Sequence, residues 1–175
     1  MPLIKFSRYF VDYGVRIGYK DAEIDIQTSK AWVNILETLG IIFLLHPYSN
    51  NVLKRTIKTP KVYFYDTGLV CYLTKWSSPE VAESGAMSGA LLENFTVSEI
   101  VKGYQNAGLE PYLYFYRDRD AKEIDVILEG DGKLCPLEIK KTATPDKRIV
   151  HTFGVIDKSP CNSVPVLSSA WRSSS

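Results

Sequence analysis

Two acids and a lysine interrupt an apolar stretch in EIDVILEGDGKLCPLEIKK, residues 123–141. Asp125 lies among isoleucine and valine residues, and Glu138 and Lys140 stand on either side of Ile139. Ionised side chains are costly to bury without partners, so these three need an explanation. Carboxylates that hold a divalent cation next to a lysine suit phosphodiester hydrolysis, because the cation polarises phosphate and lowers the pKa of a bound water.

A predicted β-hairpin brings these side chains together. Its loop contains Asp-Gly, a favoured two-residue turn whose two central positions need positive φ angles. With that turn Gly130 faces Lys133, and counting back along both strands places Asp125 opposite Glu138. Strand alternation places Lys140 on the same face as Glu138. A three-residue loop would shift this register.

Two opposed carboxylates repel each other and need a positive partner. Lys140 is one candidate, and a hard divalent cation such as Mg²⁺ or Mn²⁺, held by Asp125 and Glu138, is another. The alternative is an exposed cross-strand ion-pair cluster, which contributes about 0–1 kcal/mol per pair. The apolar surroundings disfavour that alternative, because Ile127 is expected to share the face of Asp125.

A helix predicted over residues 89–108 carries a fourth acid. At about 100° per residue, Val97, Ile100 and Tyr104 share one face, and Glu93 falls in the middle of it. A carboxylate on a buried stripe needs a cation, hydrogen-bond donors or a metal. A first-turn glutamate that complements the helix dipole is the alternative, and both interpretations stay open.

The N-terminal third has the element order of a winged helix. Thr28 or Ser29 is predicted to cap a helix that Gly40 ends. Apolar, β-branched and aromatic content predicts strands over residues 41–48 and 61–66, with a turn between them. Helix, helix, strand, turn, strand is the order expected of that fold.

Three further segments are interpreted structurally. Asp66 is expected to cap the following helix rather than to act in catalysis, because its carboxylate can accept backbone N–H groups. Residues 77–88, rich in serine and glycine, are expected to form a loop or hinge. A helix is expected after Pro145, and His151 on it is interpreted as a surface or packing residue.

Basic and amide side chains in three places are candidates for contact with nucleic acid. The formal net charge is only +1, so any such affinity must come from a local patch. The alternative for each place is an ordinary solvated surface, on which lysines also protect edge strands from aggregation. The candidates are Lys30 and Asn34 on the first helix, Lys54, Arg55 and Lys58 between the two strands, and Lys141, Lys147 and Arg148 after the hairpin.

Composition limits the classes of protein. With 45% hydrophobic and 23% charged residues, the chain is expected to fold as a globular protein. Three cysteines without paired spacing argue against a disulfide framework or a cysteine zinc site and favour the reducing cytoplasm. The sequence shows no signal peptide, no run of about 18 apolar residues and no GxxxxGK[ST] loop, so neither a membrane partner nor ATP hydrolysis is expected.

The spacing of Asp125, Glu138 and Lys140 after a helix with Glu93 resembles the PD-(D/E)xK nuclease superfamily, with its restriction-endonuclease-like fold. Several blocks are similar to the C-terminal region of prokaryotic AAA-type ATP-binding proteins, which carries a nuclease-like domain of unknown function. These blocks are TPKVYFYDTGLVCYL, GALLENFTVSEI, LYFYRDRDAKEIDVILE and PLEIKKTATP, and IQTSKAWVNILETLGIIFLLHPYSNN resembles the winged-helix segment of those proteins. The resemblance covers roughly residues 15–158.

This resemblance implies an α/β chain, α+β overall. A winged-helix segment is expected over residues 1–66, an α/β/α nuclease-like domain with a mixed sheet over residues 67–167, and a disordered tail over residues 168–175. The chain lacks the ATPase module of these proteins, so it is expected to be a fragment of a longer protein or a truncated relative.

The resemblance also implies roles for single residues. Glu93 would be the helix acid, Asp125 and Glu138 the ligands of Mg²⁺ or Mn²⁺, and Lys140 the catalytic lysine. The sequence departs from the superfamily pattern at one position, because Ile124 stands where proline precedes the aspartate.

The function expected is metal-dependent hydrolysis or processing of DNA, with double-stranded DNA and an AAA-type ATPase module as partners. One alternative is a non-catalytic regulatory module that binds DNA or a partner. Another is a protein–protein adaptor, because the second helix of the winged-helix segment offers only Lys30 as a base and carries the apolar residues Trp32 and Val33.

Overall fold

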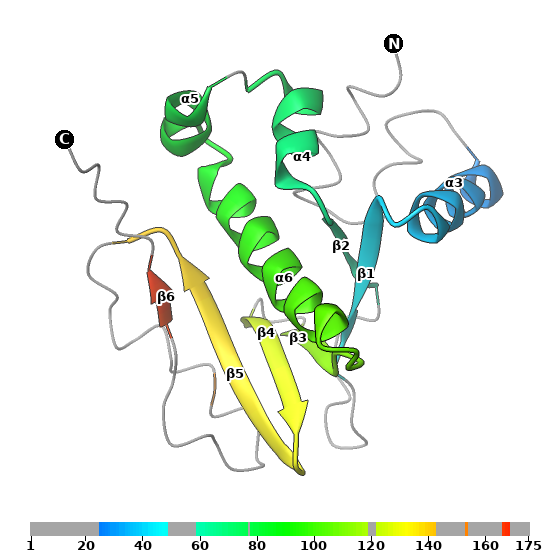
Figure 1. Ribbon diagram of the computed structural model, residues 1–175, viewed down its shortest axis with the longest axis vertical. Coiled ribbons are helices and arrows are strands. Elements are labelled where there is room, and N and C mark those ends of the chain that lie inside the picture. The colour runs from blue at the N-terminus through cyan, green and yellow to red at the C-terminus, as the bar shows by residue number, and fades with distance from the viewer. Residues whose placement is uncertain are drawn as a thin grey trace. The chain divides into compact units, whose positions relative to one another are not determined.

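The computed structural model describes residues 25–48, 59–76, 78–118, 122–142, 153 and 166–168 (Figure 1). Contacts divide them into two units. The first unit contains residues 25–46, 59–76 and 78–109, and the second contains residues 47–48 and the described residues from 110 onwards. Both units contribute strands and the described helices lie in the first, so the chain is a mixed α+β protein, as expected.

Helix α3 (Ile26–Thr38) begins earlier than the sequence predicted. Its N-cap is Asp25, whose carboxylate accepts hydrogen bonds from the backbone N–H groups of Gln27 at 2.8 Å and Thr28 at 3.0 Å. The hydrogen bond from the Thr28 hydroxyl, followed by the backbone ones, lowers the pKa of Asp25. The cap predicted at Thr28 or Ser29 is therefore wrong, because an aspartate one turn upstream already satisfies these donors.

The first unit contains a pair of antiparallel strands, β1 (Ile42–Pro47) and β2 (Lys61–Phe64). Gly40 follows α3 with a φ angle of 65°, a left-handed conformation that suits glycine, and it separates α3 from β1. The strands predicted over residues 41–48 and 61–66 are thus confirmed, and so is the glycine that ends the helix. The predicted turn between them lies outside the described residues.

Two short helices follow β2. Helix α4 (Thr67–Thr74) begins at Asp66, whose Oδ1 accepts hydrogen bonds from the backbone N–H groups of Gly68 at 2.7 Å and Leu69 at 3.3 Å. The predicted capping role of Asp66 is confirmed. Helix α5 (Pro79–Ser84) begins at Ser78 and occupies part of the stretch expected to be a loop. Serine before proline at the first helical position favours a helix start, and this signal outweighs the loop composition.

Gly85, which ends α5, leaves room for an aromatic ring. A Cβ atom at this position would lie 2.5 Å from Cη2 of Trp76 and 2.8 Å from the carbonyl oxygen of Val81. We expect Gly85→Ala to lower the free energy of unfolding by about 1–3 kcal/mol, because either the ring or the backbone must move. Urea denaturation measures this difference. Gly89→Ala is the matched control, because a Cβ there meets nothing within 4 Å, and equal losses in both variants would contradict the prediction.

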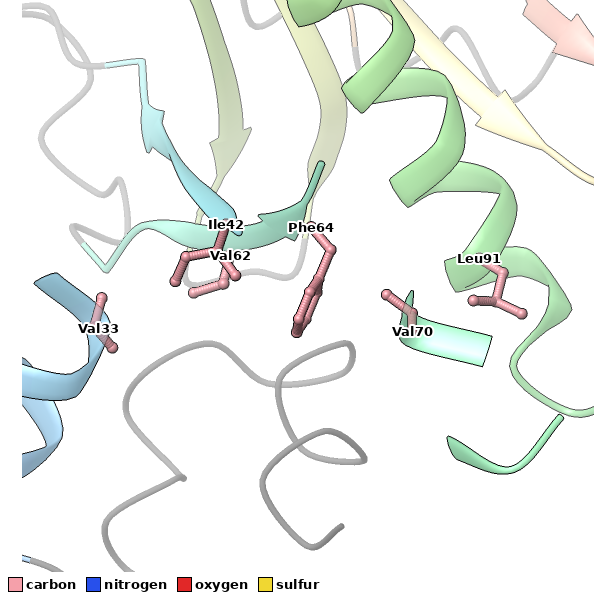
Figure 2. Close-up of a cluster of buried hydrophobic side chains, with 6 residues drawn as sticks. All are labelled: Val33, Ile42, Val62, Phe64, Val70 and Leu91. Carbon is pink, nitrogen blue, oxygen red and sulfur yellow. The ribbon is translucent and has the colours of Figure 1, made fainter. Parts of the chain in front are cut away.

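Helix α6 (Ser88–Asn106) packs against β2, α4 and α5. Its buried residues are Leu91, Asn94, Val97, Ser98 and Val101. The predicted face centred on Glu93 is therefore rotated from the observed one, because a small serine and an asparagine contribute to the stripe that faces the core. Figure 2 shows the apolar cluster of this unit, which consists of Val33, Ile42, Val62, Phe64, Val70 and Leu91.

Asn94 fixes α6 to the backbone of β2. Its Oδ1 accepts a hydrogen bond from the backbone N–H of Phe64 at 2.8 Å, and its Nδ2 donates to the carbonyl oxygen of Phe64 at 3.1 Å. The same Nδ2 donates to the Thr67 hydroxyl at 3.0 Å. The amide thus pairs with the backbone of Phe64 as a neighbouring strand would. It provides hydrogen bonds for backbone groups that are buried.

The second unit is built on a mixed sheet. Strands β3 (Leu113–Arg117), β4 (Glu123–Gly130) and β5 (Lys133–Lys140) pair antiparallel in that order, and β6 (Val166–Ser168) runs parallel to β5. In Figure 1, β5 lies between β4 and β6. The core of this sheet consists of Tyr116, Ile124, Ile127 and Leu134, with Tyr48, Tyr114 and Phe153 packed against it.

Strand β4 contains one extra residue. Tyr114 pairs with Ile127 and Tyr116 pairs with Ile124, so Phe115 alone faces two residues, Asp125 and Val126. This is the arrangement of a β-bulge, which bends a strand and redirects its side chains.

Two expectations about the chain's environment can be compared with the structure. Among the described residues, none of the helices combines the length and the apolar content that a membrane span requires. Cys135 on β5 is disulfide-bonded, although the number and spacing of the cysteines argued against a disulfide framework.

Candidate functional site

The hairpin turn has the geometry that the sequence predicts. Asp131 and Gly132 have φ angles of 52° and 71°, and Gly130 pairs with Lys133. Pairing continues without a shift to Val126 and Leu137. The predicted register is confirmed up to this point, and the next step along both strands reaches the two acids.

Asp125 replaces a backbone acceptor at the place where β4 and β5 stop pairing. Its Oδ2 accepts a hydrogen bond from the backbone N–H of Ile139 at 2.8 Å. The residue is buried, although it is ionisable. The bulge at Asp125 and Val126 interrupts the regular strand here. The Asp125 carboxylate therefore accepts the hydrogen bond from Ile139 that a backbone carbonyl group would accept in a regular strand.

Lys140 bridges the two acids. Its Nζ lies 2.7 Å from Oε1 of Glu138 and 3.8 Å from Oδ2 of Asp125. The side chains of both acids are 9% exposed, whereas that of Lys140 is 45% exposed. The three residues that the sequence singled out on this hairpin therefore come together, with two fixed carboxylates inside and an ammonium group at the surface.

The second carboxylate oxygen of Glu138 is buried and has no hydrogen-bond partner among the described residues. A buried acceptor without a donor costs about 1–3 kcal/mol, and more when it is charged. A divalent cation would supply the missing partner, and Mg²⁺ is commonly held by one or two carboxylates together with water and phosphate. Two acids fit that mode, although the described part of the chain contains no group of three or more potential metal ligands.

The bulge changes the surroundings expected for Asp125. Ile127 was expected on the same face as Asp125, but Ile124 and Ile127 pack together in one cluster with Tyr116. Residues three apart share a face here because the bulge adds a residue between them. The apolar surroundings of Ile127 therefore do not indicate that Asp125 lies in apolar surroundings as well.

Glu93 has partners of its own in the first unit. Its Oε1 accepts hydrogen bonds from Nζ of Lys61 at 2.9 Å and from the hydroxyl of Tyr63 at 2.5 Å. Strand β2 thus supplies a cation and a hydroxyl donor for Glu93, although this acid does not lie on the buried stripe where the sequence placed it. Sequence reasoning missed this pair, although strand alternation places Lys61 and Tyr63 on the same face.

The candidates for nucleic-acid contact are only partly described. Lys30 and Asn34 are exposed on α3, and Lys141 is exposed after β5. The other candidates lie outside the described residues, and they are Lys54, Arg55, Lys58, Lys147 and Arg148. The two apolar residues noted on α3 differ in exposure, because Val33 is buried while Trp32 is 41% exposed.

Asp118 is a buried acid that the sequence reasoning did not single out. Its Oδ1 accepts a hydrogen bond from the backbone N–H of Lys122 at 2.9 Å, and its Oδ2 accepts one from the hydroxyl of Tyr116 at 3.3 Å. These bonds join Asp118, which follows β3, to Lys122, which precedes β4, so Asp118 has a structural role before the strand that carries Asp125.

Comparison with known proteins gives matches to two domains of unknown function. Residues 88–167 match DUF4143, and residues 15–80 match DUF8612. Uncharacterized protein Mb2031c of Mycobacterium bovis and Uncharacterized protein Rv2008c of Mycobacterium tuberculosis are each 30% identical to the chain over 119 residues. That region is 67% of this chain and 26% of each relative, so the match spans about a quarter of their length.

No solved structure matches the chain. The predicted catalytic residues Glu93, Asp125, Glu138 and Lys140 all fall within residues 88–167, the segment that resembles the domain of unknown function DUF4143.

Proposed function

We propose that the chain is a metal-dependent phosphodiesterase module that acts on DNA, with Asp125 and Glu138 as ligands of Mg²⁺ or Mn²⁺. The observation that carries this proposal is the buried Oε2 of Glu138, which has no hydrogen-bond donor among the described residues. A hard cation is a suitable partner for such an oxygen. When bound, the cation would polarise a phosphate group and lower the pKa of a water molecule.

The chain's own residues would prepare this site. The backbone N–H of Ile139 orients the carboxylate of Asp125, and Lys140 holds Glu138. Because the Lys140 side chain is 45% exposed, its ammonium group can also reach a phosphate oxygen from solvent.

The nuclease-like interpretation is supported by the mixed sheet, in which the acids lie on neighbouring strands β4 and β5. The winged-helix interpretation is supported by the order α3, β1, β2 and by the exposure of Lys30 and Asn34. The resemblance to the C-terminal region of AAA-type ATP-binding proteins further suggests an ATPase module as partner and the cytoplasm as location.

A non-catalytic module that binds DNA or a partner is the second candidate. The observation in its favour is that Lys140 contacts both carboxylates, while Glu93 is bound by Lys61 and Tyr63. In that case the acids contribute to folding only, and no metal is needed.

Cleavage of DNA in the presence of Mg²⁺ or Mn²⁺ tests the proposal. Plasmid and end-labelled duplex oligonucleotide are incubated with the protein and each metal, or with EDTA. We expect Asp125→Asn to reduce metal-dependent cleavage by about tenfold or more, because an amide is a poorer ligand than a carboxylate.

Asp131→Asn is the matched control, since it makes the same change in the exposed turn of the same hairpin. Asparagine tolerates the positive φ angle there, so the control should retain full activity. Equal cleavage by the wild type and Asp125→Asn would identify a contaminating nuclease. Absence of both cleavage and Mn²⁺ binding in the wild type would favour the second candidate.

A further inference from the structure

We propose that Lys140 is a built-in counter-cation that a divalent ion must displace from Glu138, so that this lysine limits the metal affinity of the site. The inference rests on the proposed function, because it concerns the same two carboxylates. It adds a regulatory role. With Lys140 in place one of the two negative charges of the site is balanced, and with Lys140 displaced both carboxylates are open to a metal ion.

Both cations compete for the same two carboxylates, those of Asp125 and Glu138. The ammonium group lies 2.7 Å from Oε1 of Glu138 and 3.8 Å from Oδ2 of Asp125. A metal ion held by Asp125 and Glu138 would place a second positive charge beside the Lys140 ammonium group, and like charges repel. The lysine and the ion therefore do not bind this pair of acids with full strength at the same time.

The exposure of the three side chains shows which of them can move. The two acids are 9% exposed, and Asp125 is tied to the backbone of Ile139. Lys140 has a flexible stem and is 45% exposed, so its ammonium group can turn into water while the acids stay in place.

The net charge of the site predicts whether its metal affinity rises or falls when Lys140 is removed. Two buried carboxylates with one ammonium group leave a net negative charge, which still attracts a dication. Removing the ammonium group makes the pair more negative and removes the ion-pair partner of Oε1 of Glu138. Metal affinity should then rise, whereas a lysine that acts only as a structural brace would give no gain.

Mn²⁺ titration of four proteins by calorimetry tests this inference. We expect Lys140→Met to bind Mn²⁺ about tenfold or more tightly than the wild type, within the usual range of coupling between two ligands. Lys140→Arg keeps the charge and should stay within about threefold of the wild type. Lys102→Met is the matched control, because Lys102 is 37% exposed and lies 2.7 Å from Glu99.

The outcomes separate this inference from the proposed function. If the wild type binds Mn²⁺ and Lys140→Met binds it equally or more weakly, the proposed displacement of Lys140 is wrong, while the proposed metal site is supported. If no variant binds Mn²⁺, the metal site itself is wrong. Binding by Lys140→Met alone would support displacement in its strongest form.

A measurement on the wild type covers the case in which Lys140→Met does not fold. Lysines are labelled by reductive ¹³C-methylation, and the Lys140 resonance is assigned by its loss in Lys140→Arg. Saturating Mg²⁺ is expected to shift this resonance towards that of an exposed lysine, while the Lys102 resonance stays unchanged. A Lys140 resonance that does not move on saturation would overturn the inference.

Discussion

Asn94→Leu is expected to lower the free energy of unfolding by about 3–5 kcal/mol, because it removes three hydrogen bonds, two of them to buried backbone groups. The amide of Asn94 bonds the backbone N–H and carbonyl of Phe64 and the hydroxyl of Thr67. Leucine has a similar size but neither donates nor accepts. The loss is a large part of the total of about 5–15 kcal/mol typical of a folded domain, and urea denaturation measures it.

Two further variants make this result specific. Asn106→Leu changes an exposed asparagine at the end of the same helix and should alter stability by no more than about 0.5 kcal/mol. Asn94→Asp keeps an acceptor for the Phe64 N–H but loses both donated bonds, so an intermediate loss is expected. A loss below about 1 kcal/mol in Asn94→Leu would contradict the importance of these bonds.

Glu138→Leu is expected to change stability and activity in opposite directions. It removes a buried carboxylate with an oxygen that lacks a donor among the described residues, and the 45% exposed Lys140 can be hydrated by solvent instead, so the free energy of unfolding should rise by about 1–3 kcal/mol. It also removes one of two proposed metal ligands, so metal-dependent cleavage should fall by about a thousandfold. Parallel denaturation and cleavage assays measure both effects on the same preparation.

A gain in stability together with a loss of cleavage distinguishes an acid that serves function from one that serves folding. If Glu138 contributes mainly to folding through its ion pair with Lys140, then Glu138→Leu will be less stable than the wild type. Glu129→Leu is the matched control, because Glu129 is an exposed acid near the other end of the same hairpin. It should leave cleavage unchanged and alter stability by no more than about 0.5 kcal/mol.

Local signals in the sequence were sufficient for much of the hairpin and its flanking elements. Asp131 and Gly132 determine the turn type, and the turn type determines which residues face each other. Strand alternation then predicts that Lys140 contacts Glu138, as observed. The cap at Asp66 and the glycine after α3 follow equally local rules.

Tertiary contacts account for most of what the sequence did not reveal. Lys61 and Tyr63 bind Glu93 from more than twenty-five positions upstream, and Asn94 bonds a backbone segment just as distant. No periodicity indicates such pairings. The sequence also gives no indication of the bulge in β4, because Asp125 and Val126 fit the pattern of a regular strand.

The extra residue in β4 has a consequence for how such a protein can change by mutation. In-frame loss of the codon for Asp125 would remove an acid and the irregularity in one event, leaving a continuous ladder between β3 and β4. Gene copies that lose the acid in this way keep a sheet that pairs more regularly than the parent. Descendants without the carboxylate pair should therefore be reachable by a single event that preserves the pairing of β3 with β4, at the cost of the hydrogen bond from Ile139 to Asp125.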